Sequence, residues 1–493
     1  MKKITIGNEV FYVLQVGDTI KDINGRDVYI KKLLSDTGGQ GQVFLVDYCG
    51  KELVLKWYWP QYLAALRKNK IRCDVNRVPL NGNAPKQIDE VLENGDKVFY
   101  KVLTDKTDVR NPLRRNKEFA WPLAITQWDG NPQKCFGYIM RYIDMDVYMP
   151  FTPIVRHPAR DYWKNVTVKL TACINMAKNF KLLHYNGGLS YQDLSDGNIY
   201  VNPQTGDVII ADHDNVIRNG VNIKTIQGSS GYIAPEIIMG KASPSELTDR
   251  FSLAVLLFRI LMNGPHPFEG PHSRVNDENV FYGSDPVFMF DPKDDRNRPT
   301  IGKYGEQKYA RYSWAQTPRY IQELFARVFY KENLSKPEMR PTEDEWLKAL
   351  MKLRSEQFAC PHCRRNRNEL TSLAVEADQT EVTCKICKAT VRLPKVELQF
   401  NGVMRTRARL IPGKTIYQSQ YNRLCNDYTK EYLRTMIENG ALKLVNKSGE
   451  NITVTKQDGT SVILGDGQAV AVEMGMTLRD NLGITATVVP FGG

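Results

Sequence analysis

Apolar and polar residues alternate along residues 1–60, as they do in strands that bury one face. Turn signals at Asn24-Gly25 and Gly38-Gly39 divide this stretch, which predicts a series of strands. Residues 61–118 are polar and irregular, so we expect an insertion around one helix there. Strand character returns over residues 121–145. The first part of the chain is therefore predicted to be rich in sheet.

Helical spacing dominates the next part of the chain. Apolar residues recur every three or four positions from Val166 to Tyr185, which predicts a helix with one buried stripe. Residues 251–262 are apolar on nearly every side, so we expect a helix enclosed within a lobe. The prediction is completed by strands over 199–201 and 208–210, a turn-rich segment over 271–317, and helices over 318–329 and 342–355.

The totals describe an ordinary globular chain of 493 residues, with 42% hydrophobic and 25% charged residues. No apolar run approaches the ~18 residues of a membrane helix, and the basic start lacks the apolar core of a signal peptide. We therefore expect a cytoplasmic protein with no membrane contact. The net charge of +12 comes from basic residues spread along the chain, so we expect a solvated surface and no nucleic-acid partner.

A glycine-rich loop lies between two strand patterns in residues 34–46, LSDTGGQGQVFLV. Glycine allows a backbone to approach phosphates closely and to point its N–H groups at them. The next strand carries Lys56, whose ammonium could reach the same phosphates. A glycine-rich hairpin alone can be only a turn, and a strand lysine alone can be only a solvated edge residue. Together they indicate a nucleotide site.

Two acidic motifs follow in order. Residues 191–198, YQDLSDGN, contain Asp193 and Asn198, and Asp212 ends an apolar strand farther along. A carboxylate can orient an attacking hydroxyl and accept its proton, while carboxylate and amide oxygens can hold Mg²⁺. Either motif alone could be a hairpin with turn aspartates. Both in this order indicate phosphoryl transfer.

These motifs, together with GSSGYIAPE over residues 228–236, resemble those of protein kinases. The resemblance implies that Asp193 and Lys56 are catalytic and that Mg²⁺ binds Asn198 and Asp212. It implies a hinge near 141–143 and an ATP site formed by Gly38, Gly39, Gly41, Val43, Lys56, Met140 and Tyr142.

The substrate side of the resemblance depends on four further residues. Ser229 would hydrogen-bond Asp193 and shape the shelf for the substrate. Glu236 would pair with a buried arginine, for which Arg340 is the candidate, and Asp249 would cap the backbone of the catalytic loop. Small-molecule phosphotransferases generally lack the Ala-Pro-Glu segment, so we expect a Ser/Thr-type kinase that acts on protein partners or on itself. A pseudokinase scaffold and a small-molecule phosphotransferase are the alternatives.

The chain departs from the family pattern at several positions. Asp36 replaces the first loop glycine, Tyr191-Gln192 replaces His-Arg, Ser195 replaces a lysine, and His213-Asp214 replaces Phe-Gly. The missing arginine usually senses a phosphate on the activation loop, so we expect regulation through partners; Thr225, Ser229 and Ser230 are candidates for self-phosphorylation. The family also pairs its lysine with a helical glutamate, for which Glu90 and Glu93 both stay open, as does a surface helix.

The closest pattern is that of bacterial eukaryotic-like kinases associated with tellurite-resistance-type gene clusters. The marks are Trp121-Pro122-Leu123, an FGYIM strand, an HPFEG segment and an NRP segment. The resemblance implies a von Willebrand-type metal-binding protein and a metal-dependent phosphatase as partners.

Two CxxC pairs, Cys360 with Cys363 and Cys384 with Cys387, are spaced as half-sites of one tetrahedral zinc site. Four thiolates would close the site to water, which predicts a structural Zn²⁺ in a zinc ribbon. Redox pairs or buried cysteines are the alternative. The nine cysteines and the lack of an export signal argue against a disulfide framework.

Short strands with recurring glycine turns follow and are typical of a β-sandwich. They loosely resemble a forkhead-associated domain, with Ser419 and Asn422 where serine and histidine are expected, so phosphothreonine binding and a docking role both stay open. The expected fold is α+β, a bilobal kinase followed by a zinc ribbon and a small sandwich. The expected bounds are an N-terminal extension over 1–25, lobes over 26–143 and 144–355, the ribbon over 356–395 and the FHA-like sandwich over 396–493.

Overall fold

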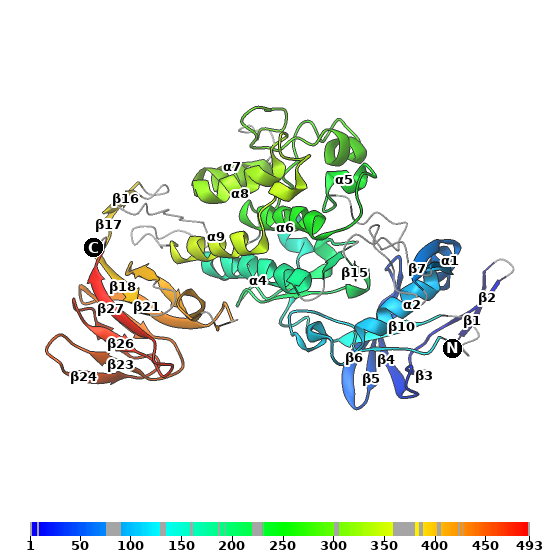
Figure 1. Cartoon of the computed structure of the whole chain (residues 1–493), viewed down its shortest axis with the longest axis horizontal. Helices are drawn as coiled ribbons and strands as arrows, with labels where there is room; N and C mark the ends of the chain where they lie inside the picture. The colour runs from blue at the N-terminus through cyan, green and yellow to red at the C-terminus, as the bar shows by residue number, and fades with distance from the viewer. Residues whose placement is uncertain are drawn as a thin grey trace.

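The computed structural model describes residues 2–6, 9–74, 90–128, 135–157, 160, 162–185, 188–191, 193–218, 229, 231–299, 305–357, 380–383, 388–401, 406–422, 424–425 and 427–491. These residues form an N-terminal lobe, a helical lobe and a C-terminal β region (Figure 1). The helical lobe lies between the other two parts in this view. Helices and sheets are mixed along the chain, in agreement with an α+β fold.

The N-terminal lobe is built on an antiparallel sheet with the strand order β3-β4-β5-β6-β10-β9. Its strands are β3 (Thr19–Lys21), β4 (Asp27–Ser35), β5 (Gly41–Tyr48), β6 (Lys51–Tyr58), β9 (Ala124–Ile125) and β10 (Gly137–Arg141). A separate hairpin, β1 (Lys2–Ile6) with β2 (Glu9–Val13), precedes it. Alternation along β5 buries Phe44 and Val46 against the lobe core, which explains why this strand is central.

The expectation of one helix over residues 61–118 is wrong. The structure has α1 (Pro60–Lys68), a hairpin of β7 (Lys70–Asp74) and β8 (Glu90–Asn94), α2 (Gly95–Lys106) and the short η1 (Pro112–Arg115). Pro60 supplies the fixed φ of a helix start, and Gly95 allows α2 to begin against α1, since a Cβ there would lie 2.5 Å from the Leu66 carbonyl oxygen. A hairpin thus separates the two helices, and the polar sequence of this segment did not predict it.

The helical lobe surrounds two long helices, α4 (Val166–Tyr185) and α6 (Glu246–Leu261). Both confirm the sequence prediction, and α6 is enclosed, with Leu253, Leu256 and Leu257 fully buried. Besides α7, which is described below, this lobe also contains the helices α3 (Thr152–Arg156), α5 (Pro235–Ile238), α8 (Arg319–Phe329), α9 (Glu343–Ser355), η2 (Asp196–Asn198), η3 (His213–Asn215), η4 (Asn279–Ser284) and η5 (Pro337–Met339). Its strands are β11 (Met149–Pro150), β12 (Leu189–Tyr191), β13 (Ile199–Val201), β14 (Val208–Ile210) and β15 (Val216–Arg218).

The segment over residues 271–317 is less irregular than expected, because it ends in α7 (Gly305–Gln316). The mean hydropathy of α7 is low, so its sequence carries only a weak helical pattern. Trp314 of α7 stacks on Phe290 with ring centroids 4.6 Å apart. This aromatic contact helps to hold α7 against the lobe, although the sequence of α7 has only a weak apolar pattern.

The C-terminal region contains two antiparallel sheets, in the orders β19-β18-β27-β26-β23-β24 and β20-β21-β22-β25, which share one hydrophobic core. Their strands are β18 (Val396–Phe400), β19 (Arg407–Arg409), β20 (Thr415–Tyr417), β21 (Glu431–Glu438), β22 (Ala441–Asn446), β23 (Ile452–Thr455), β24 (Ser461–Leu464), β25 (Ala469–Ala471), β26 (Thr477–Arg479) and β27 (Thr485–Pro490). The short η6 (Gln418–Gln420) follows β20, and a small hairpin of β16 (Glu381–Thr383) with β17 (Thr390–Arg392) precedes the sheets.

Among the helices of the described residues, none combines the length and the apolar character that a membrane crossing requires.

Candidate active site

A cleft of about 730 Å³ lies between the two lobes. It is lined by the glycine-rich loop of residues 34–46, called the phosphate loop below, and by the hinge near 141–143. Asp193 of the catalytic loop and Asp212, the first residue of the segment 212–215 that is called the metal loop below, complete the lining. The lining includes every residue that the sequence suggested for ATP, namely Gly38, Gly39, Gly41, Val43, Lys56, Met140 and Tyr142, together with Asp193 and Asp212. The volume lies within the usual range for small-molecule sites.

The glycines of the phosphate loop occupy structurally different positions. Gly41 begins β5, and a Cβ there would lie 2.2 Å from the Trp57 carbonyl oxygen on β6, so only glycine fits. The indole N–H of Trp59 donates to the Gly38 carbonyl at 2.9 Å and holds the loop at its tip. A Cβ at Gly39 would meet nothing within 4 Å. The loop is thus fixed at two points, and its backbone is open to the cleft at Gly39.

Lys56 is enclosed, with only 6% of its surface exposed. Its ammonium donates to Gln40 Oε1 at 2.7 Å and to Asp212 Oδ1 at 3.2 Å, and it lies 3.3 Å from Asp214 Oδ2. Burial alone would lower the pKa of Lys56, but the two carboxylates outweigh burial and raise the pKa above its usual value. Lys56 is therefore charged and placed at the inner end of the cleft.

The metal loop begins at Asp212, whose backbone has a φ of 54° in the left-handed region. Aspartate tolerates this conformation better than most residues, and its occurrence at a cleft points to a functional constraint. The next residue, His213, turns away from the cleft and is fully buried, with its ring edge-on to Phe119 at 5.0 Å. Its Nε2 shares a hydrogen bond of 3.1 Å with the hydroxyl of Tyr191. Burial, together with nearby Lys106, lowers the pKa of His213 to about 3, so this imidazole is neutral.

The catalytic loop is tied together by local hydrogen bonds. Asn198 Nδ2 donates to the Asp193 carbonyl at 2.9 Å, and Ser195 Oγ donates to Asn198 Oδ1 at 3.0 Å. The hydroxyl of Ser229 donates to Asp193 Oδ1 at 3.0 Å. The Asp193 carboxylate therefore lines the cleft with its Oδ1 held by Ser229.

The donor set near the cleft fits Mg²⁺, which prefers carboxylate and amide oxygens. The Asp212 side chain is 35% exposed and lines the cleft. The Ala211 N–H donates to the Asn198 carbonyl at 2.8 Å, which brings the two candidate ligands to adjacent backbone positions. A bound Mg²⁺ would neutralise phosphate charge, while Lys56 and the loop backbone would orient the phosphates.

One ion pair and one buried carboxylate stabilise the segments next to the catalytic residues. Arg340 is 1% exposed and binds both carboxylate oxygens of Glu236, at 2.7 and 2.9 Å, while donating to the Leu247 carbonyl at 2.8 Å. Asp249 accepts the Tyr191 N–H at 3.0 Å, at the start of the catalytic loop. These contacts hold the segment after Ser229 and the catalytic loop on one rigid base.

Residues 151–347 match the model of the protein kinase domain. This part of the chain is therefore similar to a protein kinase domain. The curated relatives include the rat NUAK family SNF1-like kinase 2 (Rattus norvegicus), 38% identical over 21% of this chain and 16% of the relative. The protein kinase YegI of Escherichia coli (strain K12) is 24% identical over 54% of this chain and 40% of its own length. The Arabidopsis thaliana serine/threonine-protein kinase SRK2C is 30% identical over 25% of this chain and 28% of the relative.

The chain thus spans less than half of the length of these relatives. The matched model and the kinases among the relatives show what this chain is similar to.

The expectation of a helical glutamate beside Lys56 is wrong for both candidates. Glu90 and Glu93 lie on strand β8, because residues 90–94 pair with β7 before the helix begins at Gly95. Among the described residues, the carboxylates that contact Lys56 are Asp212 and Asp214.

Sequence reasoning assigned no role to Gln40, Lys106 or Asp214, although each contacts Lys56 or the metal loop. Lys106 is the last residue of α2 and donates to the His213 carbonyl at 2.7 Å. The only local signal for Asp214 was its place two residues after Asp212, which is also usual for a turn aspartate.

The stability of the kinase domain is expected to fall as the pH rises from 6.5 to 9. His184 lies between Asp249 (3.0 Å) and Glu343 (3.1 Å). Burial opposes its charge, but these two hydrogen-bonded carboxylates raise the pKa of His184 to about 9. A raised pKa in the folded state stabilises the fold below the unfolded pKa, and this contribution, on the order of 3 kcal/mol, is lost as the pH passes about 9.

Denaturant unfolding at pH 6.5 and 9 would measure this loss, with His184→Gln as the comparison. The pKa of Glu343 is lowered to about 2, so that carboxylate stays ionised over the whole window. Lys414, whose burial lowers its pKa to about 8, titrates in both proteins and cancels in the comparison. Equal pH slopes for the wild type and His184→Gln would contradict the prediction.

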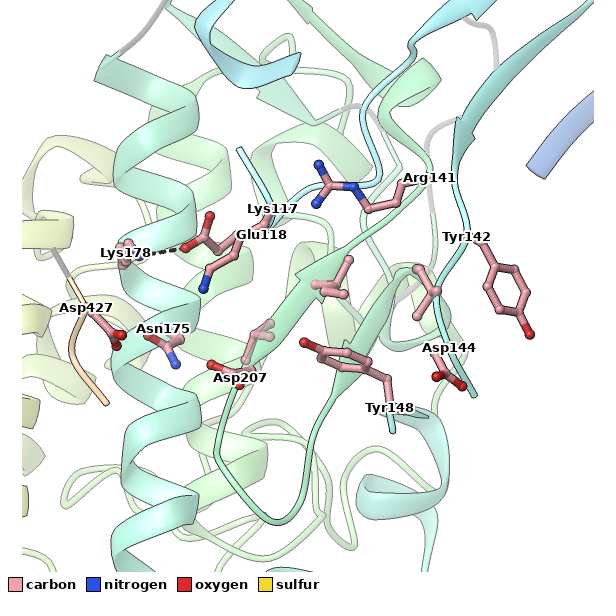
Figure 2. A pocket seen from close by; sticks show the side chains of 13 residues that line it. Lys117, Glu118, Arg141, Tyr142, Asp144, Tyr148, Asn175, Lys178, Asp207 and Asp427 are labelled. Atoms are coloured by element: carbon pink, nitrogen blue, oxygen red, sulfur yellow. Dashed lines mark hydrogen bonds and ion pairs between the residues drawn. The ribbon is translucent and has the colours of Figure 1, made fainter. Parts of the chain in front are cut away.

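A second cavity, of about 440 Å³, lies behind the hinge and is shown in Figure 2. Side chains from the hinge, from α4 and from the turn before β14 point into it. Lys178 of α4 pairs there with Glu118 at 2.8 Å, and Asp427 of the C-terminal region forms part of the wall. Nearby, the buried guanidinium of Arg354 lies 3.5 Å from the ring centroid of Tyr417 and donates to the Tyr428 carbonyl. The C-terminal sheets are thus packed onto the helical lobe.

Several sequence predictions lie outside the described residues. They are the zinc site of Cys360, Cys363, Cys384 and Cys387, the self-phosphorylation candidates Thr225 and Ser230, and the departure at Gln192. Within the described part of the chain, no group of three or more histidine, cysteine, aspartate or glutamate residues is arranged to hold a metal ion. Ser419 is 7% exposed and lies in η6 beside the contact between Tyr417 and Arg354.

Proposed function

We propose that this protein transfers the γ-phosphate of ATP to serine or threonine hydroxyls of protein partners or of its own chain. The observation that carries the proposal is the hydrogen bond of Ser229 to Asp193, made directly beside the segment that Glu236 and Arg340 hold in place. A general base beside a segment that an ion pair holds in place suits the alignment of a polypeptide substrate.

We assign a role to each of the predicted site residues, and the positions of Lys56, Asp193 and Asp212 in the lining of the cleft support the assignment. Lys56 and the phosphate loop orient the α- and β-phosphates, and Asn198 and Asp212 hold Mg²⁺. Asp193 orients the acceptor hydroxyl and accepts its proton. Val43, Met140 and Tyr142 surround the base of the nucleotide. Most of the barrier is lowered by positioning and by charge stabilisation, because phosphoryl transfer needs little covalent help from the protein.

Labelling with the purified full chain tests the proposal. We expect phosphate from Mg-ATP to appear on serine or threonine of generic acceptor proteins or of the chain itself, and to be absent when EDTA removes Mg²⁺. ATP binding without any phosphorylated protein would favour the pseudokinase alternative. Consumption of ATP only with an added metabolite would favour a small-molecule phosphotransferase.

We further propose that the four paired cysteines form a structural zinc ribbon between the helical lobe and the C-terminal sheets. Thiolate-only ligation at CxxC spacing is typical of structural Zn²⁺. We expect one zinc per chain by metal analysis, and Cys360→Ser with Cys384→Ser to lose it. Zinc at less than half an equivalent in protein purified with zinc present would contradict the ribbon.

For the C-terminal sheets we propose docking to the kinase domain, in place of phosphothreonine binding. Ser419 is enclosed near the contact of Arg354 with Tyr417, so its hydroxyl is not presented to a phosphopeptide. We also propose that the protein belongs to the tellurite-resistance-type group and lies in the cytoplasm. Its partners would then be a von Willebrand-type metal-binding protein and a metal-dependent phosphatase. Co-purification of the chain from its host would test those partners.

A further inference from the structure

The inner end of the cleft holds one lysine between two carboxylates. Lys56 Nζ is 3.2 Å from Asp212 Oδ1 and 3.3 Å from Asp214 Oδ2, so the ammonium is shared in this structure. The two carboxylates differ sharply in exposure. The Asp212 side chain is 35% exposed and lines the cleft, whereas the Asp214 side chain is 0% exposed and lies behind the lysine.

Asp214 is surrounded by groups that favour its negative charge. The hydroxyl of Tyr58, on the same strand as Lys56, donates to Asp214 Oδ2 at 2.8 Å. Burial and the neighbouring Asp214 raise the pKa of Tyr58 well above its usual value, so this phenol stays protonated and remains a donor. A carboxylate enclosed in this way needs cationic and hydrogen-bonding partners, because burying an uncompensated charge is very unfavourable.

Helix α2 fixes the backbone on both sides of this carboxylate. Lys106 Nζ donates to the His213 carbonyl at 2.7 Å and to the Asp214 carbonyl at 3.3 Å. The indole N–H of Trp121 in turn donates to the Lys106 carbonyl at 3.0 Å. The helix therefore contributes a cation to the metal loop, and the loop contributes the anion that meets Lys56. The side chains of Lys56, Lys106 and Asp214 are all at least nine-tenths buried.

The two carboxylates cannot play the same part once ATP and Mg²⁺ are bound. Asp212 faces the cleft and is the candidate metal ligand, so a bound cation would engage it. Gln40, which also contacts Lys56, lies on the phosphate loop and faces the same ligand. Asp214 has no surface in the cleft, so a ligand bound there would not contact its carboxylate.

We propose that Asp214 is the positioning residue for Lys56: it holds the ammonium toward the nucleotide phosphates and keeps it from pairing with Asp212 alone. This inference rests on the proposed kinase function. Because the anion comes from the metal loop and α2 clamps that loop through Lys106, the lysine and the metal loop are assembled as one unit. Alignment of Lys56 then requires no movement of a glutamate on α2 or β8.

The experiment compares Asp214→Asn with Glu93→Gln in the full chain. For each we would measure ATP binding in EDTA, the kcat and KM for Mg-ATP, and the thermal midpoint. Without Asp214 the lysine pairs with Asp212 and is drawn from the phosphates. For Asp214→Asn we expect about tenfold weaker metal-free ATP binding and about 100-fold lower kcat/KM, shared between kcat and KM. Glu93→Gln should stay within about twofold of the wild type.

The alternatives predict different changes in ATP binding and in the Mg²⁺ requirement of Asp214→Asn. Removing a negative charge near bound phosphates without any positioning effect would make metal-free ATP binding tighter, and a metal ligand would change only the Mg²⁺ concentration needed for half-maximal activity. Either result for Asp214→Asn overturns the proposal. An equal loss in Glu93→Gln would also overturn it.

Tyr58→Phe keeps the test valid if Asp214→Asn does not fold. It leaves the charge of Asp214 in place and removes one hydrogen bond to it. We expect about threefold weaker metal-free ATP binding, and no further loss when Tyr58→Phe is added to a folded Asp214→Asn. Unchanged binding in Tyr58→Phe would count against the proposal. Since binding is read without phosphotransfer, wild-type protein that binds ATP but labels no acceptor would refute the proposed function and leave this comparison informative.

Discussion

Replacing Asp193 by asparagine is expected to lower the rate of phosphotransfer by about 1,000-fold. The carboxylate is the group at the cleft that can accept the proton of an attacking hydroxyl, and an amide of the same shape cannot. The surrounding contacts survive the change. Ser229 can still donate to the remaining side-chain oxygen, and Asn198 still donates to the main-chain carbonyl of residue 193. We therefore expect a loss of chemistry with little loss of fold or of ATP affinity.

Initial rates with saturating Mg-ATP would measure this effect, together with ATP affinity and the thermal midpoint. Asp344→Asn is a matched control, since Asp344 is a surface carboxylate, 71% exposed, that pairs with Lys181 on the outside of the helical lobe. Its rate should stay close to that of the wild type. Retention of more than a tenth of the activity in Asp193→Asn would contradict the role of general base.

Replacing Arg340 by methionine is expected to destabilise the kinase domain by about 3–5 kcal/mol. Methionine fills much of the same volume, but Glu236 loses both of its guanidinium hydrogen bonds and the Leu247 carbonyl loses its donor. Arg340 is 1% exposed, so little water is available to replace these contacts. An uncompensated carboxylate next to the substrate shelf should also lower activity, because the segment that contains Ser229 leads into Glu236.

Urea denaturation monitored by tryptophan fluorescence would measure the change, and Arg319→Met provides the control. Arg319 pairs with Glu323 on α8 but is 89% exposed, so its loss should cost less than about 0.5 kcal/mol. Adding Glu236→Gln to Arg340→Met should recover part of the stability, since it removes the uncompensated charge. A loss of less than 1 kcal/mol in Arg340→Met would contradict the importance of this pair.

The elements that the sequence predicted best are the two long, largely apolar helices of the helical lobe. The helix from Val166 to Tyr185 is found as α4, and the helix expected over 251–262 lies within α6. In both, the apolar positions face one continuous core, so the pattern in the sequence repeats the packing in the structure. The prediction of one helix over residues 61–118 was wrong for the opposite reason. The hairpin in this segment is held by backbone pairing between β7 and β8. Backbone pairing does not require a regular pattern of apolar residues, so the sequence does not show it.

Among the site residues, those that belong to a sequence motif could be predicted, whereas those that join the site only through a tertiary contact could not. Asp193, Asn198 and Asp212 stand at spacings set by short strands and turns, and two of them, Asp193 and Asp212, line the cleft. Ser229 and Asp193 are separated by 36 positions along the chain, yet their hydrogen bond follows from a recognisable segment. Gln40 and Lys106 have no such segment, and their contacts emerged only from the packing of the lobes.

The sequence by itself determined the order of the chemical groups: a lysine on a strand after a glycine loop, then a carboxylate, an amide and a second carboxylate at short local spacings. Only the tertiary structure decided which carboxylate holds that lysine. Lys56 and Asp214 are 158 positions apart, and local sequence cannot say which of two neighbouring aspartates is turned inward. The left-handed turn at Asp212 and the clamp from Lys106 enclose Asp214 and expose Asp212. Burial in the folded chain thus assigns different roles to two side chains of the same kind.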